Sequence, residues 1–166
     1  ADASQLALTQ IELDEMVGSD MYRSDGEEIL EVDLHINSAI AAASNDSIEL
    51  AIKTFSELLN GELNDQQLVR TELNIGILLY NNGEYEEAKS HFERVIRLET
   101  VREPIIEKGW WLYGNTLLNT GKIAEAREAI YNAYVMNGRF REPALTLLNE
   151  IDTELIGTSP GKMQTP

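Results

Sequence analysis

The chain has 166 residues, which is one domain by length, and its 43% hydrophobic and 25% charged residues are typical of a globular protein. Its formal charge of −16 repels phosphate backbones and anionic lipid surfaces, so we expect no nucleic-acid partner. The chain has no cysteine and two histidines, and it has no apolar run near the ~20 residues that span a bilayer. We therefore expect no metal, no cofactor and no direct membrane insertion.

Residues 1–31 predict an N-terminal helix over Ser4–Val17, with an imperfect apolar stripe, followed by an acidic polar loop. The helix is expected either to cap the first of the repeated helical units that follow or to dock on their groove. Residues 1–60 carry thirteen acidic and two basic residues, which indicates either a solvated surface or one that selects a basic partner. The Ala1 start suits a removed leader or a segment boundary, so an exported or periplasmic location and a cytoplasmic one are equally compatible.

A repeat organises the middle of the chain. Residues 83–96 and 121–134 share a starting Gly, Glu-Ala at the fifth and sixth places, and apolar residues at the tenth, thirteenth and fourteenth. Residues 46–59 form a weaker copy. A helical pattern with a small residue precedes each copy, so we predict stacked helical hairpins in which small residues meet across each pair: Ala39 with Ala51, Gly76 with Ala88, and Gly114 with Ala126.

The repeat resembles the tetratricopeptide repeat, a helix–turn–helix unit. The best unit, 107–140, supplies the pattern residues Trp110, Tyr113, Gly114, Leu117, Ala126, Ile130 and Ala133, with Gly138 where Pro is usual. The unit 69–102 supplies Ile75, Gly76, Leu79, Ala88, Phe92 and Val95, but has Glu72 where a Trp-like residue is expected. The unit 32–65 supplies Ala39, Ala42, Ala51, Phe55 and Leu58. The resemblance implies an all-α, right-handed solenoid of about three hairpins over residues 32–156.

Two prolines mark helix starts near the C-terminus. Pro104 and Pro143 stand in similar sequences, and proline fits the first turn of a helix, where its missing N–H is not needed. The second proline begins a predicted capping helix over 143–155, and Gly157 is the predicted stop. Residues 157–166 read as a polar tail.

Catalytic and metal-binding patterns were considered and rejected. Placing Gly26 at the sixth position of a calcium loop puts Met21 and Arg23 where carboxylates are required. His35 is expected to be partly buried and His91 exposed, and neither has a nucleophile or base at a recognisable spacing. The sequence therefore predicts that the protein is not an enzyme.

The resemblance also implies a site, because the first helices of such repeats line a concave groove for peptides. Asparagine both donates to and accepts from a peptide backbone, so an asparagine ladder would hold an extended chain without reading its sequence. The family's clamp for C-terminal carboxylates is not expected, since Leu73 and Ile77 occupy its polar places. The predicted groove residues are Asn37, Arg70, Asn74, Tyr80, Asn81, Lys108, Trp111, Asn115 and Asn119.

Alternatives remain for the larger groove residues. Tyr80 and Trp111 suit binding hot spots. The repeat pattern makes Trp110 the core residue, but the capping helix is an alternative place to bury Trp111. Arg70 and Lys108 either receive a partner's carboxylate or pair with neighbouring acids.

The sequence favours a non-enzymatic module that binds a protein or peptide partner, as an adaptor, scaffold or assembly factor. The alternative is a self-associating structural module, a homo-oligomer, that forms the soluble part of a membrane-anchored or exported bacterial protein.

Overall fold

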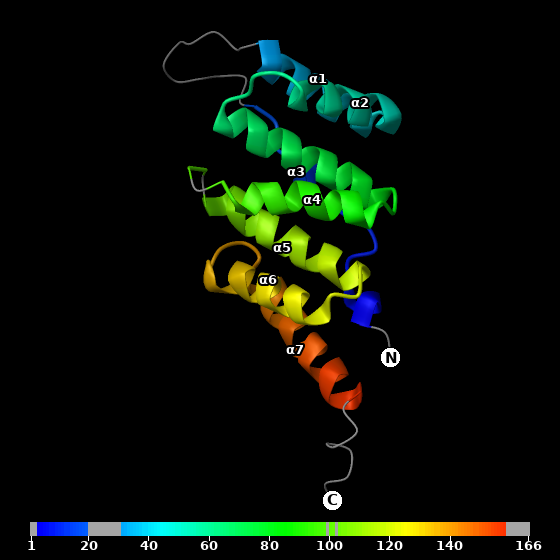
Figure 1. Ribbon diagram of the computed structural model, residues 1–166, viewed down its shortest axis with the longest axis vertical. Helices are drawn as coiled ribbons and strands as arrows, with labels where there is room; N and C mark the ends of the chain where they lie inside the picture. The colour runs from blue at the N-terminus through cyan, green and yellow to red at the C-terminus, as the bar shows by residue number, and fades with distance from the viewer. Residues whose placement is uncertain (1–2, 20–30, 99, 102, 159–166) are drawn as a thin grey trace, which may run out of the picture. The chain divides into compact units, whose positions relative to one another are not determined.

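A computed structural model describes residues 3–19, 31–98, 100–101 and 103–158. The expectation of an all-helical fold is confirmed: these residues form seven α-helices and two short 3-10 helices, η1 (Ala3–Leu6) and η2 (Leu13–Glu15) (Figure 1). The chain divides into an N-terminal unit, Gln10–Val101, and a C-terminal unit, Ala1–Thr9 with Arg102–Pro166. The helices are α1 (Glu31–Ser44), α2 (Ile48–Leu59), α3 (Asp65–Asn81), α4 (Tyr85–Ile96), α5 (Glu103–Asn119), α6 (Ile123–Val135) and α7 (Arg141–Thr158).

The N-terminal unit consists of two helical hairpins, α1–α2 and α3–α4, in which α3 also packs against α1 and α2. Helix α3 begins with a capping box, because the Asn64 side chain accepts from the N–H of Gln67 and the Gln67 side chain accepts from the N–H of Asn64. Both hairpins turn through a residue with positive φ, Asp46 at 66° and Gly83 at 79°. At Gly83, this left-handed conformation explains the glycine that starts the sequence repeat.

Close helix approach depends on glycine at two crossings, Gly76 and Gly114. A Cβ atom at Gly76 would lie 2.6 Å from the Phe92 ring, and one at Gly114 would lie 2.3 Å from Ile130 Cδ1. The nearest neighbours of these glycines are therefore the larger residues four places beyond Ala88 and Ala126. A ring or branched side chain fills the space that each glycine leaves.

Glu72, which stands where the repeat pattern has a Trp-like residue, belongs to a buried polar cluster. Glu72 is 4% exposed, and its Oε2 lies 2.5 Å from His91 Nδ1 and 3.5 Å from an Arg94 guanidinium nitrogen. The expectation that His91 is exposed is therefore wrong, since its side chain is only 16% exposed. Pairing lets a carboxylate occupy a place where the repeat pattern has an aromatic residue.

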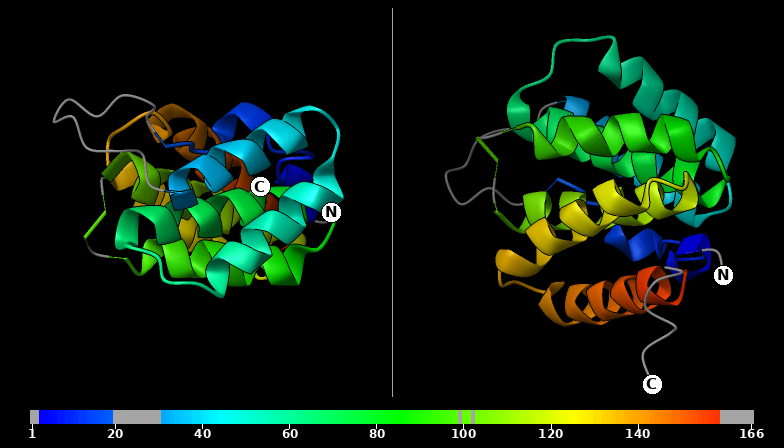
Figure 2. Two further views of the ribbon diagram at one scale, coloured as in Figure 1. Left: turned by 90° about the horizontal axis from the view of Figure 1, so that it is seen from above. Right: turned by 60° about the horizontal axis from the view of Figure 1, so that its bottom comes forward.

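The C-terminal unit packs α6 against both α5 and α7, and η1 lies against α5 and α7 (Figure 2). Pro143 stands in the first turn of α7, which starts at Arg141. The predicted stop at Gly157 is wrong, because α7 continues through it to Thr158. Gly157 does not adopt the positive φ by which a glycine ends a helix.

The predicted helix over Ser4–Val17 is also wrong. The structure places two single-turn 3-10 helices there, and the residues flanking η2 are extended, with φ and ψ of −60° and 136° at Glu12 and −62° and 143° at Met16. The apolar stripe was imperfect because its residues do not share one helical face. The positions tested for a calcium loop and rejected, the rest of the acidic loop beyond Ser19 and the tail from residue 159 lie outside the described residues. Along the described part of the chain, every helix is too short or too polar to cross a membrane.

Candidate functional site

Residues 10–19, here called the strap, lie along the first helices of the N-terminal unit. Figure 1 shows this blue segment passing behind α3. Two strap side chains are buried, with Ile11 3% exposed and Met16 7% exposed. The strap is therefore part of the packed unit, although most of its residues lie outside regular secondary structure.

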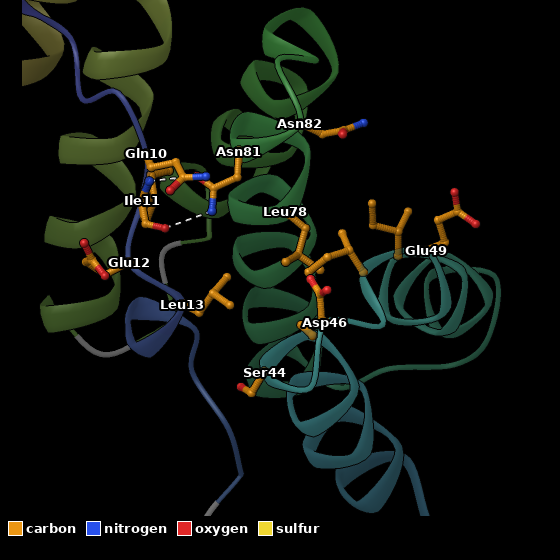
Figure 3. Close-up of a pocket in the computed structure, with 13 residues that line it drawn as sticks. Gln10, Ile11, Glu12, Leu13, Ser44, Asp46, Glu49, Leu78, Asn81 and Asn82 are labelled. Carbon is orange, nitrogen blue, oxygen red and sulfur yellow. Dashed lines mark hydrogen bonds between the residues drawn. The ribbon is translucent and has the colours of Figure 1, made fainter.

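Three asparagines hold the strap by its backbone, and we call Asn37, Asn74 and Asn81 the asparagine clamp. Asn81 Oδ1 accepts from the N–H of Ile11 at 2.7 Å, and Asn81 Nδ2 donates to the carbonyl of Ile11 at 2.8 Å (Figure 3). Asn74 makes the same pair with Val17, at 2.7 and 3.0 Å. Asn37 makes it with Ser19, at 2.8 and 3.1 Å.

The helix register explains why the three amides face one chain. Asn74 and Asn81 are two turns apart on α3, so they lie on the same face. Asn37 stands on α1, which packs beside α3. Each amide satisfies both the donor and the acceptor of one residue, as a neighbouring β-strand would. The arrangement binds an extended backbone and requires no particular side chain at the clamped residue.

A buried polar site lies at the α1 end of the strap. Ser19 Oγ donates to Asp33 Oδ1 at 2.6 Å and accepts from an Arg70 guanidinium nitrogen at 3.3 Å. The same guanidinium lies 3.9 Å from Asp33. Of the two roles considered for Arg70, the structure shows pairing with a neighbouring acid. Just before this site, a Cβ atom at Gly18 would lie 2.8 Å from Asn37 Oδ1.

A pocket of about 650 Å³ opens at the other end of the strap, between residues 10–13, the α1–α2 turn and the end of α3 (Figure 3). Its walls mix apolar side chains such as Leu78 and Ile52 with acidic ones such as Glu49 and Asp46. Ile11 of the strap closes one side of it. The pocket leaves space beside Ile11 at this end of the strap.

The C-terminal unit holds residues 3–9 differently. Asn115 Oδ1 accepts from the N–H of Leu8 at 3.0 Å, but Asn115 Nδ2 donates to the carbonyl of Trp111 within α5. Asn119 Nδ2 donates to the carbonyl of Asn115 at 3.4 Å. Lys108 is half-buried on α5 and already has an interaction partner. Asn115 therefore holds Leu8 through its amide oxygen while its amide nitrogen bonds within α5.

The two aromatic groove candidates are core residues. Trp111 is 8% exposed and stacks on Phe140, just before α7, with ring centroids 5.7 Å apart. Trp110 is only half-buried, so the expectation that it is the core residue of the two is wrong. Tyr80 is 1% exposed and meets Tyr85 edge to face at 5.1 Å. Neither Trp111 nor Tyr80 presents an open face to a ligand.

Sequence reasoning found the asparagines and Arg70 but missed the role of Ser19 and the extended backbone residues that the asparagines hold. The signals were present, since Gly18-Ser19 follows the apolar segment and Asp33 precedes Asn37 by one helical turn. They were hidden because the strap was assigned to a helix, in which its backbone donors would have been used internally. In the described part of the chain, no three His, Asp or Glu side chains are grouped so that they could hold a metal ion.

Comparison with known families gives one match, and comparison with curated proteins gives none. The match is to the tetratricopeptide repeat, over residues 73–142, which run from α3 to the start of α7. Such repeats are generally protein–protein interaction modules and are usually not catalytic. The hairpins of this chain, with their glycine-mediated crossings, agree with that match, and residues 73–142 belong to the tetratricopeptide repeat family.

Proposed function

We propose that the N-terminal unit is a non-enzymatic module that binds an extended segment of a partner protein through the asparagine clamp, as an adaptor, scaffold or assembly factor. One observation carries this proposal: Asn37, Asn74 and Asn81 each close two hydrogen bonds on the backbone of a single strap residue. Three equivalent pairs along one chain form a surface suited to backbone recognition.

The strap occupies this surface, so a partner segment must displace it. Each clamp hydrogen bond contributes about 0.5–1.5 kcal/mol net, and a buried aliphatic side chain such as Ile11 contributes about 1.5–3 kcal/mol. A partner that makes the same contacts gains similar terms but must exceed the high effective concentration of a tethered strap. The strap therefore sets an affinity threshold for partners.

Backbone recognition is tested with a labelled, acetylated and amidated peptide that copies residues 10–19, added to the full chain carrying Gly18→Val. The valine crowds Asn37, which disfavours the chain's own strap and leaves the clamp open. We expect the peptide to bind this variant at least tenfold more tightly than the unsubstituted chain. N-methylation of the peptide at its Val17 position removes the N–H that Asn74 accepts and should abolish binding.

Two controls accompany this experiment. N-methylation at the exposed, extended Glu12 position should leave the affinity within about threefold, and circular dichroism should show unchanged helix content in the Gly18→Val chain. Equal binding of the two methylated peptides would contradict recognition by the clamp. If the valine chain does not fold, competition by excess peptide against the wild-type strap, followed through the Val17 amide by NMR, gives the same answer.

A second candidate function is self-association, and one observation favours it. The segment that fits the clamp belongs to the chain itself, so every copy carries a matching ligand for every other copy. Exchange of residues 10–19 between two copies would preserve all clamp contacts. Light scattering at micromolar concentration tests this: we expect a dimer that Gly18→Val weakens, and a monomer at all concentrations would reject the exchange.

A further inference from the structure

The asparagine clamp binds backbone groups, whereas the polar site formed by Asp33 and Arg70 binds the side chain of Ser19. Ser19 is 8% exposed and Asp33 is 1% exposed, so the hydroxyl and carboxylate meet away from water. The hydroxyl donates to Asp33 Oδ1 at 2.6 Å while accepting from Arg70 at 3.3 Å. A hydroxyl can fill both roles at once, whereas an apolar group fills neither and a carboxylate cannot donate.

The chemistry of this site discriminates among residues at the Ser19 position. Replacing serine by alanine removes a hydrogen bond to a charged group, which contributes more than a neutral one and is expensive to leave unmade in a buried site. Phosphorylation removes the donating proton and adds a charge of about −1.5 to −2 beside Asp33. Arg70 is shared with Asp33, to which it lies at 3.9 Å, so it does not offset that charge fully.

The preceding residue is restricted by space. A Cβ atom at Gly18 would lie 2.8 Å from Asn37 Oδ1 and 3.5 Å from Ile40 Cδ1, while that same Asn37 closes the clamp on Ser19. A larger residue there pushes the chain away from the clamp that holds its neighbour. This end of the site therefore restricts two adjacent residues, Gly18 by space and Ser19 by hydrogen bonding.

We propose that Asp33 and Arg70 form a hydroxyl-reading subsite, and that the partner segment carries glycine followed by unmodified serine where the asparagine clamp ends at Asn37. An aliphatic residue, in the place of Ile11, occupies the other end of the clamp. This inference rests on the proposed function and specifies its ligand. The strap is the template: its Gly18-Ser19 pair shows the residues that the subsite accepts.

The test uses the peptide copying residues 10–19 with the full-length Gly18→Val chain. We expect Ser19→Ala in the peptide to weaken binding about tenfold or more, and phosphoserine at that position to weaken it further. Asp14→Asn in the peptide, at an exposed strap position, is the matched control and should bind like the parent. Equal binding of the parent and Ser19→Ala peptides would overturn the subsite, as would tighter binding of the phosphopeptide.

A double-mutant cycle assigns the effect to Asp33. In a chain carrying Asp33→Ala with Gly18→Val, the penalty for Ser19→Ala in the peptide should shrink to about twofold, because the hydroxyl has lost its acceptor. An undiminished tenfold penalty would overturn the pairing. If Asp33→Ala prevents folding, Ser19→Ala in the otherwise unchanged chain replaces it, and the backbone amide at position 19 is expected to exchange faster than in the unsubstituted chain. Failure of every peptide to bind would reject the proposed function, whereas binding without serine dependence would reject the subsite alone.

Discussion

Both units place asparagine side chains against the N-terminal segment of the chain, but they hold it differently. Residues 10–19 lie in the N-terminal unit and residues 3–9 in the C-terminal unit. The N-terminal unit closes three two-bond pairs on the strap. In the C-terminal unit, Asn115 makes one hydrogen bond, to the N–H of Leu8, and turns its donor back into α5. Asn119 stands 38 residues after Asn81, at the equivalent place of the repeat, yet its amide also donates within α5.

Both bound segments contain a short 3-10 helix, so this element does not separate them. Residues 3–6 form η1, and the N–H of Ala7 is used by the carbonyl of Ser4. In the strap, η2 uses the N–H groups of Glu15 and Met16, whereas Ile11 and Val17 give both backbone groups to an asparagine. The comparison teaches that asparagine at a groove place does not by itself close two hydrogen bonds on one residue, because the Asn115 donor is used by the carbonyl of Trp111.

The largest effect is expected at the tight crossing of the C-terminal unit. Gly114→Leu would force side-chain atoms into Ile130, whose backbone nitrogen already lies 3.3 Å from a Cβ at that position. Overpacking of this kind costs about 1–3 kcal/mol or more, and about 2–4 °C of melting temperature follows for each kcal/mol. Thermal unfolding measures the loss, and hydrogen exchange should place it in α5 and α6.

Gly157→Ala is the matched control for this substitution, because a Cβ there meets no atom within 4 Å. In a helix, that change should be neutral or stabilising by about 0.5–1 kcal/mol. An unchanged melting curve for Gly114→Leu would contradict the importance of the crossing.

Replacing one asparagine by aspartate in each unit tests whether the clamp holds the backbone differently from Asn115. Asn74→Asp retains the acceptor for Val17 N–H but places a second oxygen against the Val17 carbonyl. Loss of that donor costs about 1–3 kcal/mol, so the Val17 amide should exchange about 5- to 150-fold faster. Asn115→Asp leaves the bond to Leu8 intact, and exchange at Leu8 should change less than about threefold. Similar acceleration at both positions would remove the distinction between the units.

The smallest effect is expected at an exposed ion pair in the C-terminal unit. Hydrogen bonds from Arg127, at 2.7 and 3.0 Å, lower the pKa of Asp152 below its usual range. A lowered carboxyl pKa stabilises the fold above the unfolded pKa, and that contribution disappears as the pH falls through the folded value. Asp152→Asn should cost about 0.2–1 kcal/mol at pH 7, and this cost should shrink as the pH falls through the folded pKa. A cost that does not change with pH in thermal unfolding would exclude the ion pair as the cause.

The helices and the asparagines were predictable because both follow local rules. Helix periodicity, the small residues and the glycine turns repeat along the chain, and asparagine at groove places is visible by counting. The nearest neighbours of the two glycines were not predicted, since sequence spacing does not show that Phe92 and Ile130 fill the space over them. Burial of His91 depended on Glu72 from another helix, which no local pattern reveals.

The strap was the main failure, and its cause is physical. Helix propensity and an apolar stripe favour a helix over residues 4–17 when the segment is considered alone. Tertiary partners reverse that preference, because Asn74 and Asn81 supply the backbone hydrogen bonds that a helix would otherwise provide. Ser19 and Gly18 acquire their roles only once this segment is extended.

Pairing an amide with both polar groups of one residue has a consequence for evolution and engineering. Proline has no hydrogen on its nitrogen, so it is excluded wherever Asn37, Asn74 or Asn81 closes on the chain. New specificities can therefore arise by altering residues between the fixed points, without rebuilding the surface that holds them.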